Sequence, residues 1–259
     1  MRKTVVASIL ILTVALFSGC SANITGKLIT EEKDFTDFTE VDVEGAFNIE
    51  IVKSDSFSVT ISGDEGFFDY IAVEKEGDTL KISLDPRHTF TDFTQAAKTL
   101  TAKITMPALH RLRLAGASTG TIRGFKSSED FRLEVSGASS LDMDDIEVNS
   151  AKFEISGASK ATGNMEAGNV ELKVSGASGV ELEGSADTID IEASGASKVD
   201  LADFPIHDAD IRLSGASEAT INVKGRLDSV LSAASKLYFH GNPTIGNMEI
   251  SGASTIKHK

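Results

Sequence analysis

The chain has 259 residues, of which 41% are hydrophobic and 25% charged, so it is long enough to build a core and too apolar to be disordered throughout. Its 39 acidic and 25 basic side chains give a net charge of −14, which disfavours nucleic acid as a partner because phosphate backbones carry the same sign. Four prolines and no tryptophan point to a regular structure with few chain breakers.

The first nineteen residues have the layout of a secretory signal peptide. Arg2 and Lys3 precede an uncharged run at 4–17, which is shorter than the ~20 residues that a membrane-spanning helix needs. The one cysteine of the chain, Cys20, follows a small-residue pair and therefore resembles the lipobox of bacterial lipoproteins, although Phe17 stands where that pattern has leucine. A lone cysteine makes no disulfide within the chain. An ordinary signal peptide followed by a chance cysteine is the alternative.

The lipobox resemblance implies cleavage before Cys20, acylation with groups such as palmitate, and attachment to a membrane through the N-terminal lipid. Several acyl chains, each contributing ~0.8 kcal/mol per buried CH₂, anchor a protein stably. No aspartate follows the cysteine directly, as it does in lipoproteins kept in an inner membrane, so the resemblance indicates the outer membrane. The sequence leaves open whether the protein faces the periplasm or the cell surface. In an organism with a single membrane, the anchor would lie on its outer face.

Within the segment 38–107, residues 41–106 alternate apolar and polar side chains, which is the period of a β-strand. The expected strands cover residues 41–51, 58–61 and 80–84. Residues 89–99 lack the alternation and predict a loop or a short helix. We interpret the whole segment as irregular coils that cap a repeat structure, since terminal repeats are usually atypical.

Eight of the fourteen phenylalanines lie in this first part of the chain. They are Phe35, Phe38, Phe47, Phe57, Phe67, Phe68, Phe90 and Phe93. The simpler interpretation is that they form the core of the cap. The alternative is an exposed contact patch at residues 90–93.

Residues 108–256 contain a tetrapeptide, usually Ser-Gly-Ala-Ser, eight times at intervals of 18 to 21 residues. Its second residues are Gly116, Gly137, Gly157, Gly176, Gly195, Gly215, Ala233 and Gly252. Apolar and charged residues alternate around each copy, as in Val-Glu-Leu-Lys-Val at 170–174. A unit that short cannot bury its own apolar face, but coils stacked ~4.8 Å apart can. The predicted fold is therefore all-β, a parallel β-helix of about eight regular coils with an irregular N-terminal cap.

Each tetrapeptide predicts a corner between two strands, and a return of roughly five to nine residues completes the coil. The sequence leaves open whether Gly137 and its equivalents point inward or lie outward at a sharp turn with positive φ. Inward-facing serines such as Ser139 would be able to hydrogen-bond from coil to coil. Ala233 in the seventh copy suggests that positive φ is not obligatory at this position.

Few residues suggest catalysis or metal binding. Residues 116–120 match the G-x-S-x-G nucleophile elbow, but that motif needs a strand-to-helix turn together with a histidine and an acid. Residues 142–145 offer carboxylates to Ca²⁺ without the spacing of a calcium-binding loop, and solvated charges are the alternative. The five histidines lack metal-ligand spacing: His88, His110, His207, His240 and His258. No catalytic residue, metal or cofactor is therefore predicted.

The chain resembles the head GIN domain family of auto-transporter adhesin heads. The resemblance rests on Gly-Ala-Phe-Asn-Ile-Glu-Ile at 45–51, on Gly-Asp-Thr-Leu-Lys-Ile at 77–82, and on the series of Ser-Gly-Ala-Ser corners. It covers roughly residues 38–254. It implies a β-helical, non-enzymatic protein of the cell envelope, and it carries over neither a ligand nor a set of site residues.

These interpretations divide the chain into a signal peptide at 1–19, a lipid anchor and tether at 20–37, and a β-helix domain at 38–256. Within that domain the cap spans 38–107 and the regular repeats span 108–256. The predicted function is surface contact by a lipid-anchored envelope protein, adhesin-like or a scaffold, with an unknown protein or glycan as partner. The alternative is a carbohydrate-active enzyme, which would need two acids and a base converging in a groove.

Overall fold

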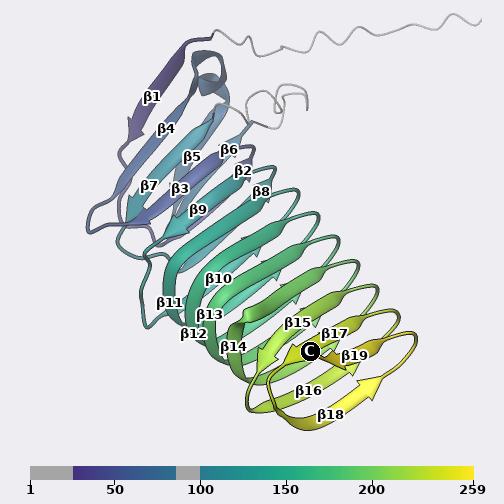
Figure 1. The fold of residues 1–259 in the computed structure, drawn as a ribbon. Helices are drawn as coiled ribbons and strands as arrows, with labels where there is room; N and C mark the ends of the chain where they lie inside the picture. Colours follow the sequence, from purple (N-terminus) through teal and green to yellow (C-terminus); the bar gives the residue numbers. More distant parts are fainter. Residues whose placement is uncertain (1–25, 86–99) are drawn as a thin grey trace, which may run out of the picture.

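The computed structural model describes residues 26–85 and 100–259, which form a parallel β-solenoid of about seven turns (Figure 1). The predicted fold class is thereby confirmed. The expected signal peptide, the candidate lipid site Cys20, residues 89–99 and the candidate patch at 90–93 lie outside the described residues. Within the described part of the chain, no helix has the length and apolar character needed to cross a membrane.

The N-terminal part of the solenoid contains seven strands and one short 3₁₀ helix among the described residues. They are β1 (Leu28–Lys33), β2 (Glu40–Gly45), β3 (Asn48–Lys53), β4 (Ser58–Asp64), η1 (Glu65–Tyr70), β5 (Ile71–Glu76), β6 (Thr79–Leu84) and β7 (Thr101–Met106). The strands β2 and β3 form a coil that lies between the strands β6 and β7 on one side and β8 and β9 on the other, with parallel pairing throughout. This part of the chain therefore stacks out of sequence order.

Antiparallel strands close this end of the molecule. β1 pairs with β4, β4 pairs with β7, and β5 pairs with β6, all antiparallel. The sequence analysis did not anticipate these pairings, and its single strand at 41–51 is wrong because the chain turns a corner between β2 and β3. Phenylalanine side chains fill the interior here, with the rings of Phe38 and Phe57 4.9 Å apart and Phe67 buried. The described phenylalanines of this region thus belong to the core of the cap.

Twelve further strands build the regular coils. They are β8 (Arg111–Gly116), β9 (Thr119–Arg123), β10 (Asp130–Val135), β11 (Ser140–Ile155), β12 (Lys160–Val174), β13 (Gly179–Ala193), β14 (Lys198–Leu213), β15 (Glu218–Val223), β16 (Arg226–Leu231), β17 (Lys236–His240), β18 (Thr244–Ile250) and β19 (Thr255–His258). The strands β11 to β14 run through the expected returns as continuous bent strands of 15 or 16 residues. These returns, to which the sequence analysis assigned no secondary structure, are therefore strand.

Two faces of the solenoid result from this winding. The first face contains β9, the N-terminal segments of β11 to β14, and β15, β17 and β19. The second face contains β8, β10, the C-terminal segments of β11 to β14, and β16 and β18. All these pairings are parallel, so residues at equivalent positions stand in columns along the solenoid axis, as Leu133, Phe153 and Leu172 do.

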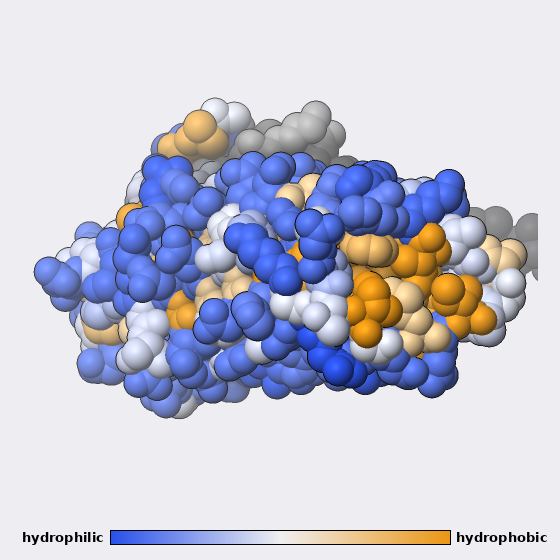
Figure 2. All heavy atoms as spheres, turned by 60° about the horizontal axis from the view of Figure 1, so that its bottom comes forward, coloured by the Kyte–Doolittle hydropathy of each residue, from blue (hydrophilic) through white to orange (hydrophobic). Residues whose placement is uncertain are grey.

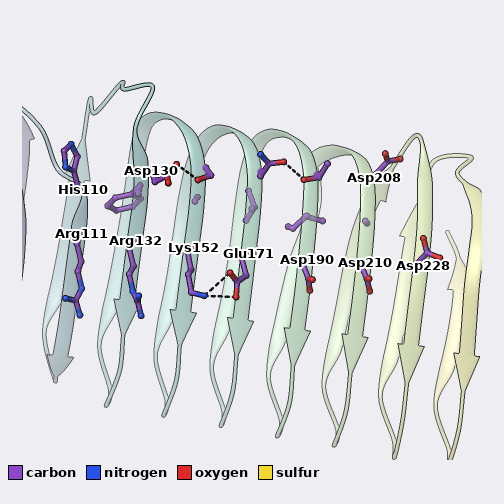
Figure 3. A pocket seen from close by; sticks show the side chains of 18 of the residues that line it. His110, Arg111, Asp130, Arg132, Lys152, Glu171, Asp190, Asp208, Asp210 and Asp228 are labelled. Atoms are coloured by element: carbon purple, nitrogen blue, oxygen red, sulfur yellow. Dashed lines mark hydrogen bonds and ion pairs between the residues drawn. The ribbon is translucent and has the colours of Figure 1, made fainter.

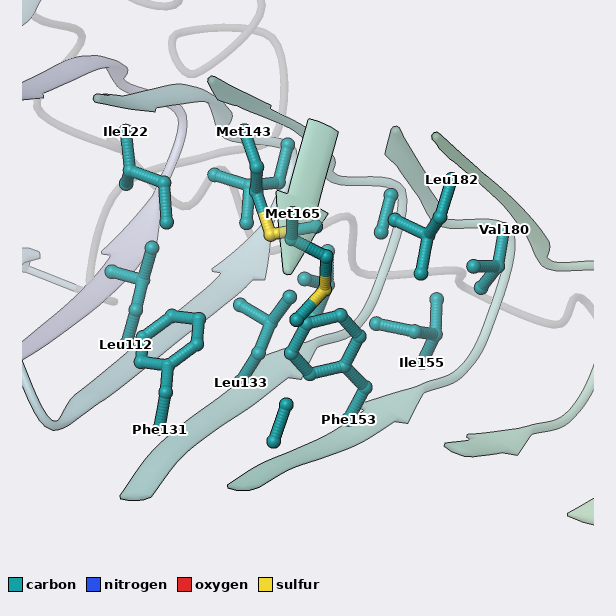
Figure 4. Packing of buried hydrophobic residues seen from close by; sticks show 14 of the residues in the cluster. Leu112, Ile122, Phe131, Leu133, Met143, Phe153, Ile155, Met165, Val180 and Leu182 are labelled. Carbon is teal, nitrogen blue, oxygen red and sulfur yellow. The ribbon is translucent and has the colours of Figure 1, made fainter. Parts of the chain in front are cut away.

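Alternate residues of each strand enter a continuous core (Figure 4). In β12 the side chains of Val170, Leu172 and Val174 are buried, whereas Glu171 and Lys173 face outward. The rings of Phe131 and Phe153 meet edge to face with centroids 6.1 Å apart. The strand period seen in the sequence is thus the alternation between core and surface.

The Ser-Gly-Ala-Ser corners form a column along one edge of the solenoid. Each glycine has positive φ, and all but the half-buried Gly215 are exposed. At Gly176, for example, φ is +77° and a Cβ atom would lie 2.4 Å from the carbonyl oxygen of Gly157. The amide of Ala177 donates to that same oxygen at 2.8 Å, and this bond recurs from coil to coil. Ala233 also has positive φ, at +63°, so the suggestion that this position does not require it is wrong. The conformation is set by the hydrogen bonds of the stacked corner and is imposed on alanine as well.

The last serine of each tetrapeptide points into the molecule. Ser139, Ser159 and Ser178 are 2 to 3% exposed. The Ser159 amide lies 3.4 Å from the Ser178 hydroxyl oxygen of the next coil and donates to it. The sequence left open whether the corner glycine points inward or lies outward at a turn. In the structure the glycine lies outward and the last serine points inward.

Candidate functional site

An open groove of about 830 Å³ crosses the second face of the solenoid (Figure 3). It lies at the start of the second-face strands, just after the chain has bent out of each return. Eight neighbouring strands contribute to its lining, namely β2 through Glu40, and β8, β10, β11, β12, β13, β14 and β16. Because every coil presents the same backbone position there, the groove is made by stacking and runs along the solenoid axis.

The central column of the groove is sorted by charge. Strand register aligns Arg111, Arg132, Lys152, Glu171, Asp190, Asp210 and Asp228 in that order. Among these seven, the three nearest the cap are cationic and the four nearest the C-terminal end are acidic (Figure 3). On the cap side of Arg111 the column continues with the carboxylate of Glu40. With ~4.8 Å between neighbouring strands, the groove changes sign over one strand spacing.

Ion pairs along and across the strands hold these side chains in place. Lys152 Nζ lies 2.8 Å from Glu171 Oε1, and Lys173 Nζ reaches the same carboxylate at 2.9 Å. Arg212 lies 3.2 Å from Asp190 and 2.9 Å from Asp210, so one guanidinium bridges two coils. The groove therefore presents an ordered lattice of charges, because each side chain is restrained by its neighbours.

The pKa values of several groove residues move away from neutrality. The Arg226 guanidinium and the backbone amide of Asn247 lower the pKa of Asp228 to about 2. Hydrogen bonds from Lys152 and Lys173 lower the pKa of Glu171, and the same contact raises the pKa of Lys173. These groups stay ionised at neutral pH, which suits ionic recognition better than proton transfer, for which a pKa near the working pH is needed.

A second row of small polar side chains borders the charged column. It contains Asp130, Ser150, Asn169, Thr188 and Asp208, aligned by the same register. The Ser150 hydroxyl donates to Asp130 at 2.5 Å and the Thr188 hydroxyl donates to Asn169 at 2.7 Å. The backbone amide of the residue at 226 donates to Asp208 at 2.6 Å and is the main cause of the lowered pKa of that carboxylate. The row adds carboxylate, hydroxyl and amide groups to those of the charged column.

The corner residues singled out by the sequence analysis lie outside the groove. The eight corner residues stand at the opposite end of the second-face strands from the groove. Within the corner at 116–120, Ser118 is 1% exposed, and its hydroxyl lies 3.3 Å from the Gly45 carbonyl oxygen and donates to it. Ser118 therefore serves the stacking of corners, and the G-x-S-x-G match is not a nucleophile elbow.

The candidate metal ligands do not converge. Among the described residues, no three histidine, cysteine, aspartate or glutamate side chains are placed to hold a metal ion. Asp144 pairs with Arg123 at 3.0 Å and Asp145 pairs with Lys126 at 2.6 Å, so these carboxylates are exposed ion-pair partners. Of the histidines, His88 lies outside the described residues. The other four are dispersed, with His110 in the groove at its cap end, His207 beside Asp208, and His240 and His258 in the last two coils.

The sequence analysis missed the groove, although a signal for it exists. Each residue of the central column stands five positions before the second residue of a tetrapeptide. Aligning the repeats on their corners places Arg, Arg, Lys, Glu, Asp, Asp and Asp in one column, in chain order. Strand alternation alone treats all of them as equivalent outward residues, which is why the sorting by charge escaped notice.

Comparison with known proteins gives one family and a set of similar folds. A family model described as "Putative auto-transporter adhesin, head GIN domain" matches residues 37–243. The chain is similar to the solved structure of a putative adhesin from Parabacteroides distasonis, with a TM-score of 0.79, 15% identity, and coverage of 91% of this chain and 98% of that one. A putative lipid binding protein from the same organism has a TM-score of 0.77 at 17% identity, with 91% and 98% covered.

A third similar structure is a putative adhesin from Parabacteroides merdae, with a TM-score of 0.76, 14% identity, and coverage of 91% of this chain and 97% of that one. At these identities the likeness shows a common fold. No curated protein matches the chain.

Proposed function

The chain belongs to the head GIN domain family, whose model covers residues 37–243, and from that membership we propose that it is a lipid-anchored, adhesin-like protein of the cell envelope that acts by surface contact. The contact surface is the groove of the second face. One observation carries this choice, namely that eight neighbouring strands present charged and polar groups at equivalent positions in one open groove. The partner is a protein segment or a glycan chain.

The shape of the groove favours an extended partner. The seven strands that carry Arg111 to Asp228, at a spacing of ~4.8 Å, give a site about 29 Å long between the first and the last of them. Each coil adds only a few polar contacts, so affinity comes from many weak contacts along the ligand. A long, repetitive ligand meets this condition better than a small molecule does.

The electrostatics of the groove support binding without catalysis. Arg212 brings Asp190 and Asp210 together, which is the grouping of two acids and a base that a carbohydrate-active enzyme would need. However, Asp210 and Asp190 raise the pKa of Arg212, so its guanidinium stays protonated and cannot accept a proton. The pKa values of Glu171 and Asp228 are lowered, opposite to the change that makes a carboxylic acid a proton donor near neutral pH.

Anchoring through Cys20 completes the proposal, with the outer membrane as the location. The described chain starts at the cap end of the solenoid, so a lipid on Cys20 would attach that end to the membrane (Figure 1). The opposite end would then point away from the membrane, and the groove, which runs along the axis, would be accessible from the side.

Cell attachment tests the role of the groove. Cells displaying the full chain are applied to a printed glycan array and to immobilised extracellular-matrix proteins. The groove variant carries Arg132→Ala, Lys152→Ala, Asp190→Ala and Asp210→Ala. A matched control removes the same number of each charge from the first face, at Lys160, Glu181, Lys198 and Glu218. The expected result is loss of attachment with the groove variant only; equal attachment by both variants would refute the groove as the contact surface.

Labelling tests the anchor independently. In cells fed radiolabelled palmitate, the full chain is expected to take up label and to sediment with membranes. Cys20→Ala is expected to abolish both, while Cys20→Ser serves as the conservative control and is expected to behave the same way because an alcohol does not replace the thiol. Membrane association that persists without Cys20 would show that something other than a lipid on Cys20 holds the chain at the membrane.

A further inference from the structure

The last coil of the solenoid leaves its core and its strand edges open. β18 pairs only with β16, and β19 pairs only with β17, among the strands that the structure describes. A strand with one free edge presents unpaired amides and carbonyls to any further strand. The last coil is therefore prepared, on both faces of the solenoid, to accept one more layer.

Apolar side chains are exposed on the same surface. Ile245 is 47% exposed and Ile250 52% exposed, and Met248 and Ile256 are partly buried. Their register partners in the previous coil include Leu231, which is fully buried, so these residues continue the core to the end of the stack. Figure 2 shows apolar side chains gathered on the end of the molecule that carries the last coil. Such exposure of core positions is unusual for the outer surface of a protein.

The opposite end differs in how its core is closed, although β1 and β5 there also pair on one side only among the described strands. Antiparallel strands cover it, and aromatic side chains such as Phe38 and Phe67 close the core beneath them. The exposed large apolar residue there is Leu28, at 70%. The two ends are therefore not complementary, because an apolar end facing the cap of another copy would leave most of its isoleucines against polar groups.

We propose that the open end binds the same end of a second copy of this chain through a two-fold axis that runs parallel to the strands. This axis places β18 of one copy antiparallel to β19 of the other, twice, so that both faces continue across the junction. The apolar residues of the two ends then cover one another. Because a two-fold contact uses the same end of both copies, the assembly closes as a dimer instead of growing into a fibre.

Charge supports this pairing of strands. Glu249 faces outward on β18 and Lys257 faces outward on β19. In the proposed dimer each glutamate lies beside the lysine of the other copy, which gives two complementary pairs. A two-fold axis perpendicular to the strands would instead stack β18 on β18 and β19 on β19. Each lysine would then lie near the same lysine of the other copy, and each glutamate near the same glutamate. The arrangement with mixed strands is therefore the one that the charges favour.

The dimer also places its two N-terminal ends far apart, at opposite ends of a doubled solenoid. If the chain is anchored as proposed above, the contact joins copies held on facing surfaces, and this step rests on the proposed function. The dimer itself does not, since its existence is measured in solution. A dimer without cell clumping would leave the inference standing and would count against the anchored orientation.

Light scattering coupled to size exclusion tests the dimer on the full chain in mild detergent. At a protein concentration of about 100 µM, which detects dissociation constants up to the same order, a dimer is expected. Ile250→Asp is expected to weaken it at least about tenfold, as loss of a central apolar contact does. Leu28→Asp, an equal change at the capped end, is expected to leave it unchanged. Far-UV circular dichroism confirms that both variants are folded.

Exchanging the charges of Glu249 and Lys257 tests the contact without changing the apolar residues of the last coil. Glu249→Lys alone and Lys257→Glu alone are each expected to weaken the dimer about five- to tenfold, because each places like charges together. The double variant is expected to recover the original affinity, since both pairs are restored with reversed sign. A monomeric unmodified chain, a ladder of larger species sensitive to Leu28→Asp, or a double variant no better than the single ones would each overturn the proposal.

Discussion

The cap and the regular coils both bury apolar side chains, but they do so by different means. In the described part of the cap, residues 26–85 and 100–106, three antiparallel pairings and a 3₁₀ helix surround a core rich in phenylalanine. In the regular coils, parallel strands repeat one register, and each buried residue lies on an equivalent residue of the next coil. Each contact in the cap occurs once, whereas the same contacts recur from coil to coil in the regular part.

This difference teaches how the two regions should respond to damage. In a stacked repeat each coil contacts only its neighbours, so its stability is close to a sum of coil and interface terms. A defect in a regular coil should therefore remain local, while a defect in the cap should affect every element that packs there. The stacking also has a second consequence at the surface, since it places the ionised groups of the groove at regular intervals.

The largest expected effect comes from removing a buried ring in either region. Phe153→Ala in the coils and Phe38→Ala in the cap should each cost ~3–5 kcal/mol of unfolding free energy, because both side chains are fully buried. Hydrogen exchange distinguishes the two variants by showing where protection is lost. Phe153→Ala is expected to lower protection in the coils next to β11 and to leave the cap unchanged. Phe38→Ala is expected to lower it across the cap strands, and equal spreading in both variants would remove the distinction drawn here.

A smaller effect is expected at the corners. Gly176→Ala should destabilise the protein by about 1–3 kcal/mol, because φ is +77° and the new Cβ would meet the Gly157 carbonyl oxygen. Ala233→Gly is the converse change at a corner that already holds alanine, and it should stabilise by up to about 1 kcal/mol. Denaturant unfolding of both variants measures the pair. A neutral result for both would mean that the stacked corner relaxes freely around a methyl group.

These two regions also show what the sequence could and could not predict. The alternation and the tetrapeptide spacing were enough to predict the fold class, because the same local pattern occurs eight times in the sequence. The sequence of the cap does not repeat, so the corner at Gly45 and the antiparallel edges had no second copy to confirm them. The strand-like returns were missed because their residues alternate less regularly than those beside the corners.

The candidate site was less predictable for a physical reason. A groove depends on the angle at which the chain bends out of each return, and that angle is a property of the backbone that residue types do not state. Its charges were visible as outward residues, yet their significance lies in the register that puts Lys152 beside Glu171. The lowered pKa of Asp228 needs the Arg226 side chain and an amide from the next coil, a contact between coils that composition cannot show.

Ion pairs in the two regions should contribute little and about equally. Lys152→Ala in the groove and Lys103→Ala in the cap each remove an exposed pair, with Glu171 at 2.8 Å and Glu50 at 3.1 Å respectively. Each change is expected to cost ~0.2–1 kcal/mol at low salt and less at high salt. Thermal unfolding at two salt concentrations measures the difference. A clearly larger loss for Lys152→Ala would show that the network around Glu171 acts cooperatively.

The smallest expected effect concerns acid, and it distinguishes an ordered groove charge from a merely exposed one. The folded protein holds the pKa of Asp228 at about 2, below its ordinary value of 3.8, so its charge favours folding above about pH 4, and this contribution is lost as the pH falls toward 2. Asp228→Asn should therefore be less stable than the parent at pH 7 and should approach it at pH 2. Asp187→Asn, an exposed change on β13, is the matched control and should leave the stability at pH 7 close to that of the parent. A gap for Asp228→Asn that stays constant from pH 7 to pH 2 would mean that its contacts with Arg226 and Asn247 do not depend on ionisation, and the argument that stacking tunes the groove would fail.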